Sequence, residues 1–342
     1  MKINGKEKCS KTGLIYVAHD TPGIQRKKQG RRFIYFDKNQ KKISQKSAIN
    51  RIENLSIPPM WKDVWICQSP NGYLQATGLD EMGRKQYLYH KEWTAHQQNL
   101  KFQKLLEFGY ALTEIRKKVK SHLRKKGWHK EKVIALIVSI LDETYIRIGN
   151  KIYQDLHGTY GLTTLRRKNL EILQDGILFK YKAKSQKYKT VKLKSKRFKR
   201  LIKECSELSG YEVFRYEDKS GKTIPVESKD VNEYLNKISG ENFTSKNFRT
   251  WGATVLAIKN YPIALQKVKE NKRLKLKRSI VKEVAKELDN TISVCEKYYI
   301  HPTVLSALLD EDYSSKKFKV KDKPKKLKYE EKLVLSILES AN

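Results

Sequence analysis

The chain has 342 residues, with 73 lysines and arginines against 37 aspartates and glutamates, so its formal net charge is +36. Hydrophobic residues make up 39% of it, a share that fits a globular protein and excludes a largely disordered one. So large a positive excess predicts a polyanionic partner, with nucleic acid ahead of an anionic membrane surface.

Composition also argues against several other classes of protein. No stretch approaches 18 apolar residues, so we expect no transmembrane helix, and the first residues lack the apolar core of a signal peptide. The four cysteines are scattered, without a CxxC pair or a histidine at ligand spacing, and the seven histidines do not cluster. We therefore expect reduced intracellular thiols and no metal.

Residues 1–95 are predicted to form a small β-rich domain. Short apolar runs predict one strand in GLIYVAH (13–19) and two in RRFIYFDKNQKKI (31–43), with a turn at 37–40. SQKSAINRIENL (44–55) predicts a short helix, and the segment 64–90 predicts three more strands. At least five short strands with one helix indicate a small antiparallel sheet or barrel.

After Trp93 the apolar spacing changes to three and four residues, which is typical of a helix and predicts a domain boundary near 92–100. We expect a mainly helical domain over 96–314, then a basic linker and a short helix over 315–342. The segment 170–194 predicts three strands, with turns at Asp175-Gly176 and Ser185-Gln186. Further helices are expected at 196–208, at 228–238, from about 246, and across 274–289.

The stretch SKNFRTWGA (245–253) is the first candidate site. With Thr244 or Ser245 as the helix N-cap, Lys246 and Arg249 share one face at i,i+3, close to backbone N–H groups that favour an anion. An anion site is one interpretation. The other is a solvated basic edge on a helix that packs in the core.

Three more stretches carry candidate residues. In TYIRIGN, Arg147 is expected beside a helix end at Gly149, where it could bind an anion or simply complement the helix dipole. In KYYIHP, Tyr298 and Tyr299 could do chemistry or lie at the edge of the core. GRKQYLYH alternates aromatic and polar residues on a predicted strand, namely Gln86, Tyr87 and Tyr89, which suits a nucleic-acid backbone or a plain cross-strand aromatic pair.

Taken together, these stretches resemble the type IB DNA topoisomerases, in the compact form found in poxviruses and bacteria. The resemblance runs from about residue 14 to 312. It includes IPPMWKDVWICQSPNGYLQATGLDEMGRKQYLYH, RIGNKIYQDLHGTYGLTTLRRKNLEI, SKNFRTWGATVLA and DNTISVCEKYYIHPTV, in the order and spacing of the family.

The resemblance implies a catalytic set. Tyr299 would be the nucleophile that forms a 3′-phosphotyrosine link, Arg147 and Arg249 would bind the phosphate, and Lys184 in the turn AKSQK would be the general acid. Asn290 stands where poxvirus members have histidine. The turn departs from the family's glycine-containing pattern, which leaves Lys182 or Lys187 as alternatives to Lys184, and Tyr298 precedes the nucleophile where a small residue is usual.

We therefore predict an α+β enzyme that clamps duplex DNA between two lobes and relaxes supercoils without ATP, metal or other cofactor. It is expected to act as a monomer, with no membrane and no obligate protein partner, in the cytoplasm or nucleoid, or in a virion if viral. One alternative is a tyrosine recombinase, which typically has histidine where this chain has Lys246. The other is a non-enzymatic basic DNA-binding protein.

Overall fold

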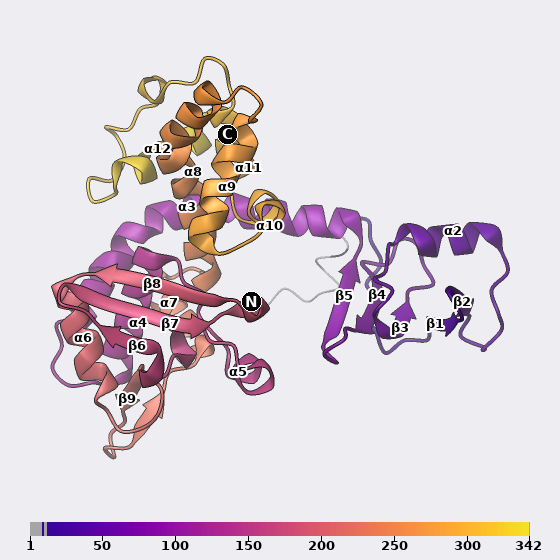
Figure 1. The fold of residues 1–342 in the computed structure, drawn as a ribbon, viewed down its shortest axis with the longest axis horizontal. Coiled ribbons are helices and arrows are strands. Elements are labelled where there is room, and N and C mark those ends of the chain that lie inside the picture. The colour runs from indigo at the N-terminus through magenta and orange to yellow at the C-terminus, as the bar shows by residue number, and fades with distance from the viewer. Residues whose placement is uncertain (1–8, 10–11, 342) are drawn as a thin grey trace. The chain divides into compact units, whose positions relative to one another are not determined.

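The computed structural model describes residue 9 and residues 12–341. The chain divides into two compact units, Met1–Lys101 and Phe102–Asn342, and the long helix α3, Lys91–His122, contributes residues to both (Figure 1). The first unit holds one antiparallel sheet, and the second is mainly helical with small sheets. The predicted α+β fold is confirmed, whereas the predicted domain limits stay a prediction.

The first unit is a five-stranded antiparallel sheet in the order β2-β1-β3-β4-β5. Its elements are β1 (Ile24–Gln29), β2 (Arg32–Phe36), α2 (Lys46–Asn54), β3 (Lys62–Ile66), β4 (Leu74–Leu79) and β5 (Lys85–Tyr89). The sheet and α2 share a small apolar core that includes Ile52 and Ile66. Along β5 the side chains alternate, so Leu88 packs on this core while Tyr87 and Tyr89 are exposed.

Two strands predicted in this unit are wrong. GLIYVAH makes a single bridge, from Ile15 to Gly72, and the chain after the turn at 37–40 makes one bridge, from Phe36 to Lys42. The strand β1, in contrast, is not predicted by apolar alternation, because Ile24 is its only buried residue. Backbone pairing with β2 along most of its length forms it instead.

The second unit contains the strands and helices that the sequence predicts over 170–289, together with several more. In chain order they are α4 (Lys130–Thr144), α5 (Lys151–His157), β6 (Leu170–Ile172), β7 (Gly176–Lys182), β8 (Tyr188–Lys194), α6 (Lys196–Ser206), β9 (Arg215–Glu217), β10 (Thr223–Pro225), α7 (Ser228–Ser239), α8 (Ser245–Glu270), α9 (Leu276–Leu288), α10 (Ile292–Tyr298), α11 (Pro302–Leu308) and α12 (Tyr329–Ser340). The strands β6, β7 and β8 form one antiparallel sheet, and β9 pairs with β10.

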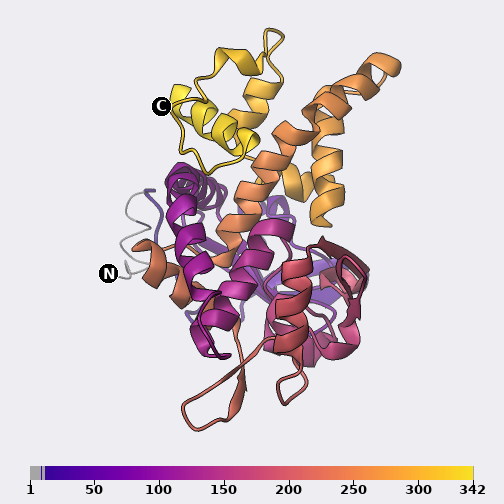
Figure 2. The same ribbon diagram turned by 90° about the vertical axis from the view of Figure 1, so that its left-hand side faces the viewer.

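Helix α8 organises the second unit. Its first half is buried almost all round, including Phe248, Trp251 and Ala253, because α4, α7, α9, α11 and α12 all pack against it. Figure 2 shows its diagonal course through the unit. A helix apolar on every side is a core element, so its polar members are there for a reason other than solubility.

The C-terminal helix α12 is joined to this core by a buried charge network. Glu331 is 1% exposed and accepts hydrogen bonds from Arg116 of α3, which also binds Asp142 of α4. Trp251 Nε1 of α8 donates to the same carboxylate at 3.4 Å. Arg116 holds the pKa of Glu331 below its usual value, although burial acts to raise it. The end of the chain is thus part of the same folded unit as α8.

Candidate active site

Arg249 lies one turn into α8, and it is one of the most deeply buried cations in the described residues, with 5% of its surface exposed. Asn247 fixes the helix start, because its Oδ1 accepts a hydrogen bond from Thr244 N at 2.9 Å. The Arg249 guanidinium donates to the carbonyl oxygens of Tyr145 and, at 3.1 Å, Leu288. Burial, and next the neighbouring Arg147, lower the pKa of Arg249.

Arg147 lies in the extended segment that follows α4. The predicted helix end at Gly149 is wrong: α4 ends at Thr144, because Tyr145 takes a left-handed conformation (φ 52°) and closes the helix onto Leu141 O. The segment then pairs with a second one, since Leu162 N donates to Arg147 O at 2.8 Å. Gly149 (φ +97°) is needed for this pairing, because the chain around Gly161 approaches it too closely for a side chain.

The turn after α9 connects the two arginines. Leu288 O accepts from Arg249, while Asp289 O, at 3.1 Å, and the side chain of Asn290 accept from Arg147. The nearest charged partner of Arg147 is Asp289, with 3.9 Å between Nη1 and Oδ2. One short turn therefore holds both guanidinium groups.

Two donors in this group have no oxygen or nitrogen acceptor in the described part of the chain. Arg249 Nε is buried and unpaired, and the Asn290 Nδ2 amide is buried against the Cys295 thiol without an oxygen or nitrogen acceptor. A buried donor left unpaired costs about 1–3 kcal/mol, so native proteins rarely retain one without a use for it.

Tyr299 faces this group and Tyr298 faces solvent. Tyr299 is the C-cap of α10, its hydroxyl hydrogen-bonds Arg249, and the guanidinium carbon lies 5.3 Å from its ring centroid. Ile300 after it is fully buried, which fixes the register. Tyr298 is 38% exposed, with Lys297 Nζ 5.3 Å from its ring. The structure thus separates the two adjacent tyrosines.

Lys184 lies in the turn of the hairpin between β7 and β8. Lys184 begins a 3-10 turn, Lys184–Gln186, and is exposed. No hydrogen bond or ion pair among the described residues connects it to either arginine.

Lys189 belongs to the inward-facing set of side chains on β8 and is half-buried. Burial first, and then Arg249 and Arg147 against the opposing effect of Asp289, lower its pKa to about 8. Sequence reasoning missed this lysine, although the alternation of TVKLK after it marks an inward face.

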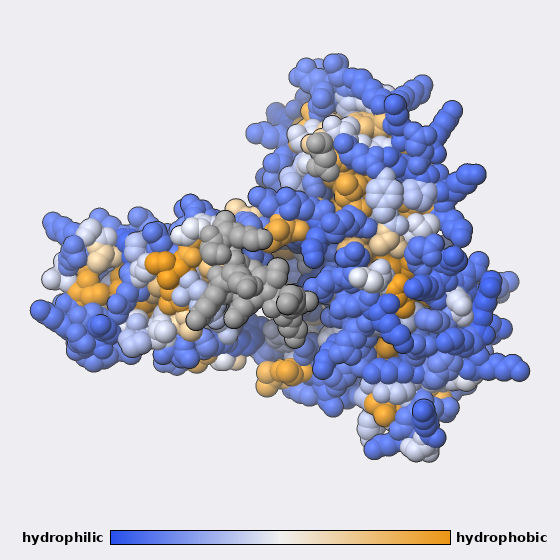
Figure 3. Space-filling view, turned by 180° about the vertical axis from the view of Figure 1, so that it is seen from behind, coloured by the Kyte–Doolittle hydropathy of each residue, from blue (hydrophilic) through white to orange (hydrophobic). Residues whose placement is uncertain are grey.

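The remaining candidate DNA-binding residues lie outside the arginine group. Lys246 is exposed on the first turn of α8. In the first unit, Tyr87 and Tyr89 stack with ring centroids 6.2 Å apart, and Tyr73 lies 5.9 Å from Tyr89. Gln86 Nε2 donates to Asp80 Oδ2 at 2.9 Å. Figure 3 shows a surface on which hydrophilic residues predominate, with apolar ones in separate groups.

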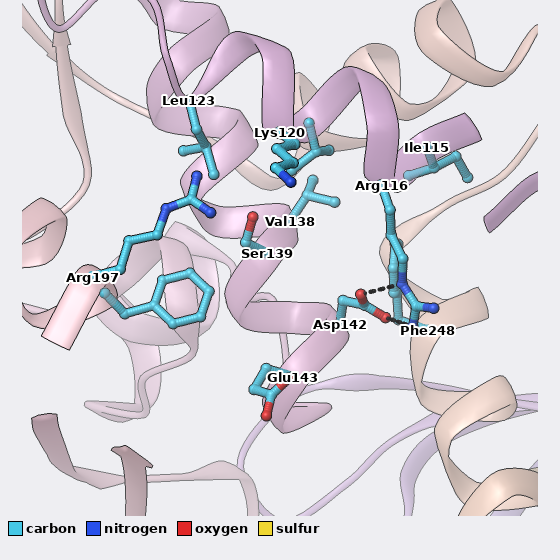
Figure 4. A pocket seen from close by; sticks show the side chains of 12 residues that line it. Ile115, Arg116, Lys120, Leu123, Val138, Ser139, Asp142, Glu143, Arg197 and Phe248 are labelled. Carbon is cyan, nitrogen blue, oxygen red and sulfur yellow. Dashed lines mark hydrogen bonds and ion pairs between the residues drawn. The ribbon is translucent and has the colours of Figure 1, made fainter. Parts of the chain in front are cut away.

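A pocket lined in part by Phe248 of α8 is not this site. Figure 4 shows it between α3, α4 and α6, with Arg116 bound to Asp142 and with Phe248 at its edge. Among the described residues that line it there is neither arginine of the site, nor Asn290, nor Tyr299. The residues that could do chemistry therefore lie outside this pocket.

Comparison with known proteins assigns the family. The family model of the catalytic core of eukaryotic DNA topoisomerase I matches residues 90–329, which is more than half of the chain. A model of the N-terminal domain of bacterial DNA topoisomerase IB matches residues 32–80. The chain belongs to the type IB DNA topoisomerase family. The predicted family and enzyme class, an isomerase acting as a DNA topoisomerase, are confirmed.

Individual members of the family show the same relationship. The chain is 31% identical to the DNA topoisomerase 1B of Acanthamoeba polyphaga mimivirus over 291 residues, covering 82% of this chain and 86% of the viral one. It is 22% identical to the DNA topoisomerase 1B of Vaccinia virus (strain Copenhagen) over 238 residues, or 69% and 73% of the two chains. The similarity to the DNA topoisomerase 1 of Mycosarcoma maydis, 30% over 173 residues, covers 45% of this chain and 17% of the fungal one.

Two features are absent from the described residues. Within residue 9 and residues 12–341, no three His, Cys, Asp or Glu side chains are grouped so that they could hold a metal ion. Across the same residues, no helix combines the length and apolar character that crossing a membrane requires.

The packing behind Arg249 gives a testable prediction for this topoisomerase. A Cβ on Gly252 would lie 2.3 Å from Cδ1 of Tyr145, whose carbonyl is an acceptor for Arg249. Gly252→Ala should therefore lower the free energy of unfolding by about 1–3 kcal/mol, as overpacking of a core does. Urea denaturation of the variant and of wild type would measure this difference. Adding Tyr145→Leu should recover part of the loss. Equal stability of Gly252→Ala and wild type would contradict this packing.

Proposed function

We propose that this enzyme relaxes supercoiled duplex DNA by cutting one strand through Tyr299, allowing the strand to rotate, and resealing it. The observation that carries the proposal is the position of the Tyr299 hydroxyl on Arg249, beside two buried donors that lack an acceptor. A phosphodiester supplies both the electrophile for the tyrosine and the acceptors for the donors.

The chemistry follows from these groups. The Tyr299 oxygen attacks phosphorus in line and gives its proton to solvent water, while a 3′-phosphotyrosine bond forms and the bond to the 5′ oxygen breaks. Charge gathers on the non-bridging oxygens as this happens. Arg147 and Arg249 can donate to them as charged groups, and Asn290 as a neutral one.

The leaving 5′ oxygen needs a proton, and Lys184 is the residue we assign to supply it. The position of Lys184 at an exposed hairpin turn supports this role, because an exposed side chain there can reach a bound DNA strand. Religation reverses the sequence. The free 5′ hydroxyl attacks the phosphotyrosine, and Lys184 takes the proton back.

No external energy source is required in this scheme. The energy of the broken phosphodiester is retained in the phosphotyrosine bond, so neither ATP nor a metal ion has a step to perform. The enzyme would act as a monomer on duplex DNA.

DNA binding apart from the chemistry is assigned to the basic surface and to the aromatic face of β5. The net charge of +36 supports many phosphate contacts and hence a steep salt dependence. Lys246 would contact backbone near the cleaved bond. Gln86, Tyr87 and Tyr89 would contact DNA from the first unit, where the two stacked rings present one face.

A relaxation gel distinguishes this function from its alternatives. The enzyme, mixed with negatively supercoiled plasmid, excess EDTA and no nucleotide, should produce a ladder of relaxed topoisomers. A tyrosine recombinase would need paired sites and would give recombined products, and a DNA-binding protein would give neither. Loss of relaxation in EDTA would contradict the scheme.

Covalent trapping tests the nucleophile. On a suicide substrate that prevents religation, wild type and Tyr298→Phe should form a covalent adduct with DNA, and Tyr299→Phe should form none. Tyr299→Phe removes one oxygen and leaves every cation in place, so it should bind duplex DNA as tightly as wild type with the same salt slope. Mass spectrometry of the digested adduct should find the DNA on Tyr299. A linkage to Tyr298 would show that the assignment is wrong.

A further inference from the structure

The inner face of strand β8 carries a lysine that the mechanism above does not use. Side chains alternate along β8, and the inward set is Lys189, Val191 and Leu193, of which the last two pack with the main core. Lys189 is paired in register with Tyr181 of β7, which is buried. Lys192, three residues further along the strand, is exposed and its Nζ lies 4.0 Å from Asp175 Oδ1. The strand therefore directs Lys189, unlike Lys192, into the protein.

The charged groups around Lys189 are those of the candidate active site. Three charged groups act on the pKa of Lys189: Arg249 of α8, Arg147 in the segment after α4, and Asp289 in the turn after α9. Tyr181, its partner across the ladder, has the same three charged neighbours, and burial raises the pKa of that phenol first of all. The Tyr181 phenol therefore stays uncharged beside these groups.

The group formed by Lys189 and these three charged residues has a net positive charge. Three cations face one carboxylate, and in the described part of the chain no hydrogen bond or ion pair involves the Lys189 ammonium. A half-buried ammonium beside two guanidinium groups is repelled by both and poorly solvated. Such an arrangement becomes favourable when an anion enters, since the anion is attracted by all three.

We propose that Lys189 contacts the phosphate at the point of cleavage, as a phosphate-binding residue that acts together with Arg147 and Arg249. The inference rests on the proposed function, because it takes the DNA strand as the anion. The role is one of charge: the ammonium keeps its proton throughout, and proton transfer to the leaving oxygen stays with Lys184. Arg249 Nε, Asn290 Nδ2 and Lys189 Nζ would then be the donors that the empty protein leaves unpaired.

A dependence of DNA binding on pH follows. With a pKa of about 8 in the free protein, Lys189 is charged below pH 8 and largely neutral above pH 9. A bound phosphate favours the charged form, so binding at high pH must take up a proton. Duplex affinity should therefore fall as pH rises through 8, by up to about tenfold per pH unit. Lys189→Arg, which keeps its charge, should bind with little change between pH 7.5 and 9.5.

The cleavage reaction tests the contact itself. In single-turnover cleavage of a suicide substrate, Lys189→Met should be slower than wild type by about tenfold or more, the rate equivalent of one charge-assisted hydrogen bond. Lys189→Arg should retain most of the rate. Lys192→Met, on the outer face of the same strand, should cleave like wild type. Thermal melts of the variants show that each is folded before rates are compared.

A substrate with a sulfur in place of the bridging 5′ oxygen separates charge from proton transfer, because sulfur leaves without a proton. Lys184→Ala should regain its rate on this substrate, and Lys189→Met should stay slow. Cleavage by Lys189→Met within twofold of wild type would overturn the inference, and so would its rescue by sulfur, which would make Lys189 the acid. Failure of wild type to form any adduct would instead overturn the proposed function.

Discussion

The burial of one guanidinium group, that of Arg249, constrains the architecture of the second unit. A cation in the core is stable only with acceptors around it, and α8 offers none of its own at this position. The acceptors are the carbonyls of Tyr145 and Leu288, at the carboxyl-terminal ends of α4 and α9. Helix carboxyl termini carry partial negative charge. Three helices thus meet at one arginine.

The choice of carbonyls rather than carboxylates has a consequence for chemistry. A carboxylate paired with Arg249 would neutralise the positive charge that attracts a phosphate to this site. Partial charges at two helix ends hold the side chain in place and leave its Nε unpaired. Among the described residues the carboxylate paired with this group is that of Asp289, 3.9 Å from Arg147, so the group as a whole keeps its positive charge. The site is rigid and still receptive to an anion.

Local patterns in the sequence predict much of this and miss the rest for identifiable reasons. The helix start at Thr244 and the burial side of Phe248 and Trp251 follow from capping and periodicity. The end of α4 cannot be predicted in this way. Gly149 is a common helix stop signal, but the helix ends earlier, at a left-handed Tyr145 whose ring packs closely on Gly252.

Lys189 shows the same limit in the site itself. The sequence points to the turn lysine, Lys184, because turns present residues to a substrate. That Lys189 is close enough to Arg249, Arg147 and Asp289 for them to act on its pKa depends on the tertiary fold, because all three are distant from it in sequence. Asp289 is missed for the same reason. Residues joined only by tertiary contacts leave no periodic signal.

The central claim is that the unpaired donors of Arg249 and Asn290 converge on the phosphate that Tyr299 attacks. A crystal structure of the covalent complex, trapped on a suicide substrate, tests it most directly through the distances from Arg249 Nε and Asn290 Nδ2 to the non-bridging oxygens. The account predicts that both lie within hydrogen-bond distance, about 2.7–3.2 Å. A phosphotyrosine at Tyr299 whose oxygens contact neither donor, with both still unpaired, would contradict it.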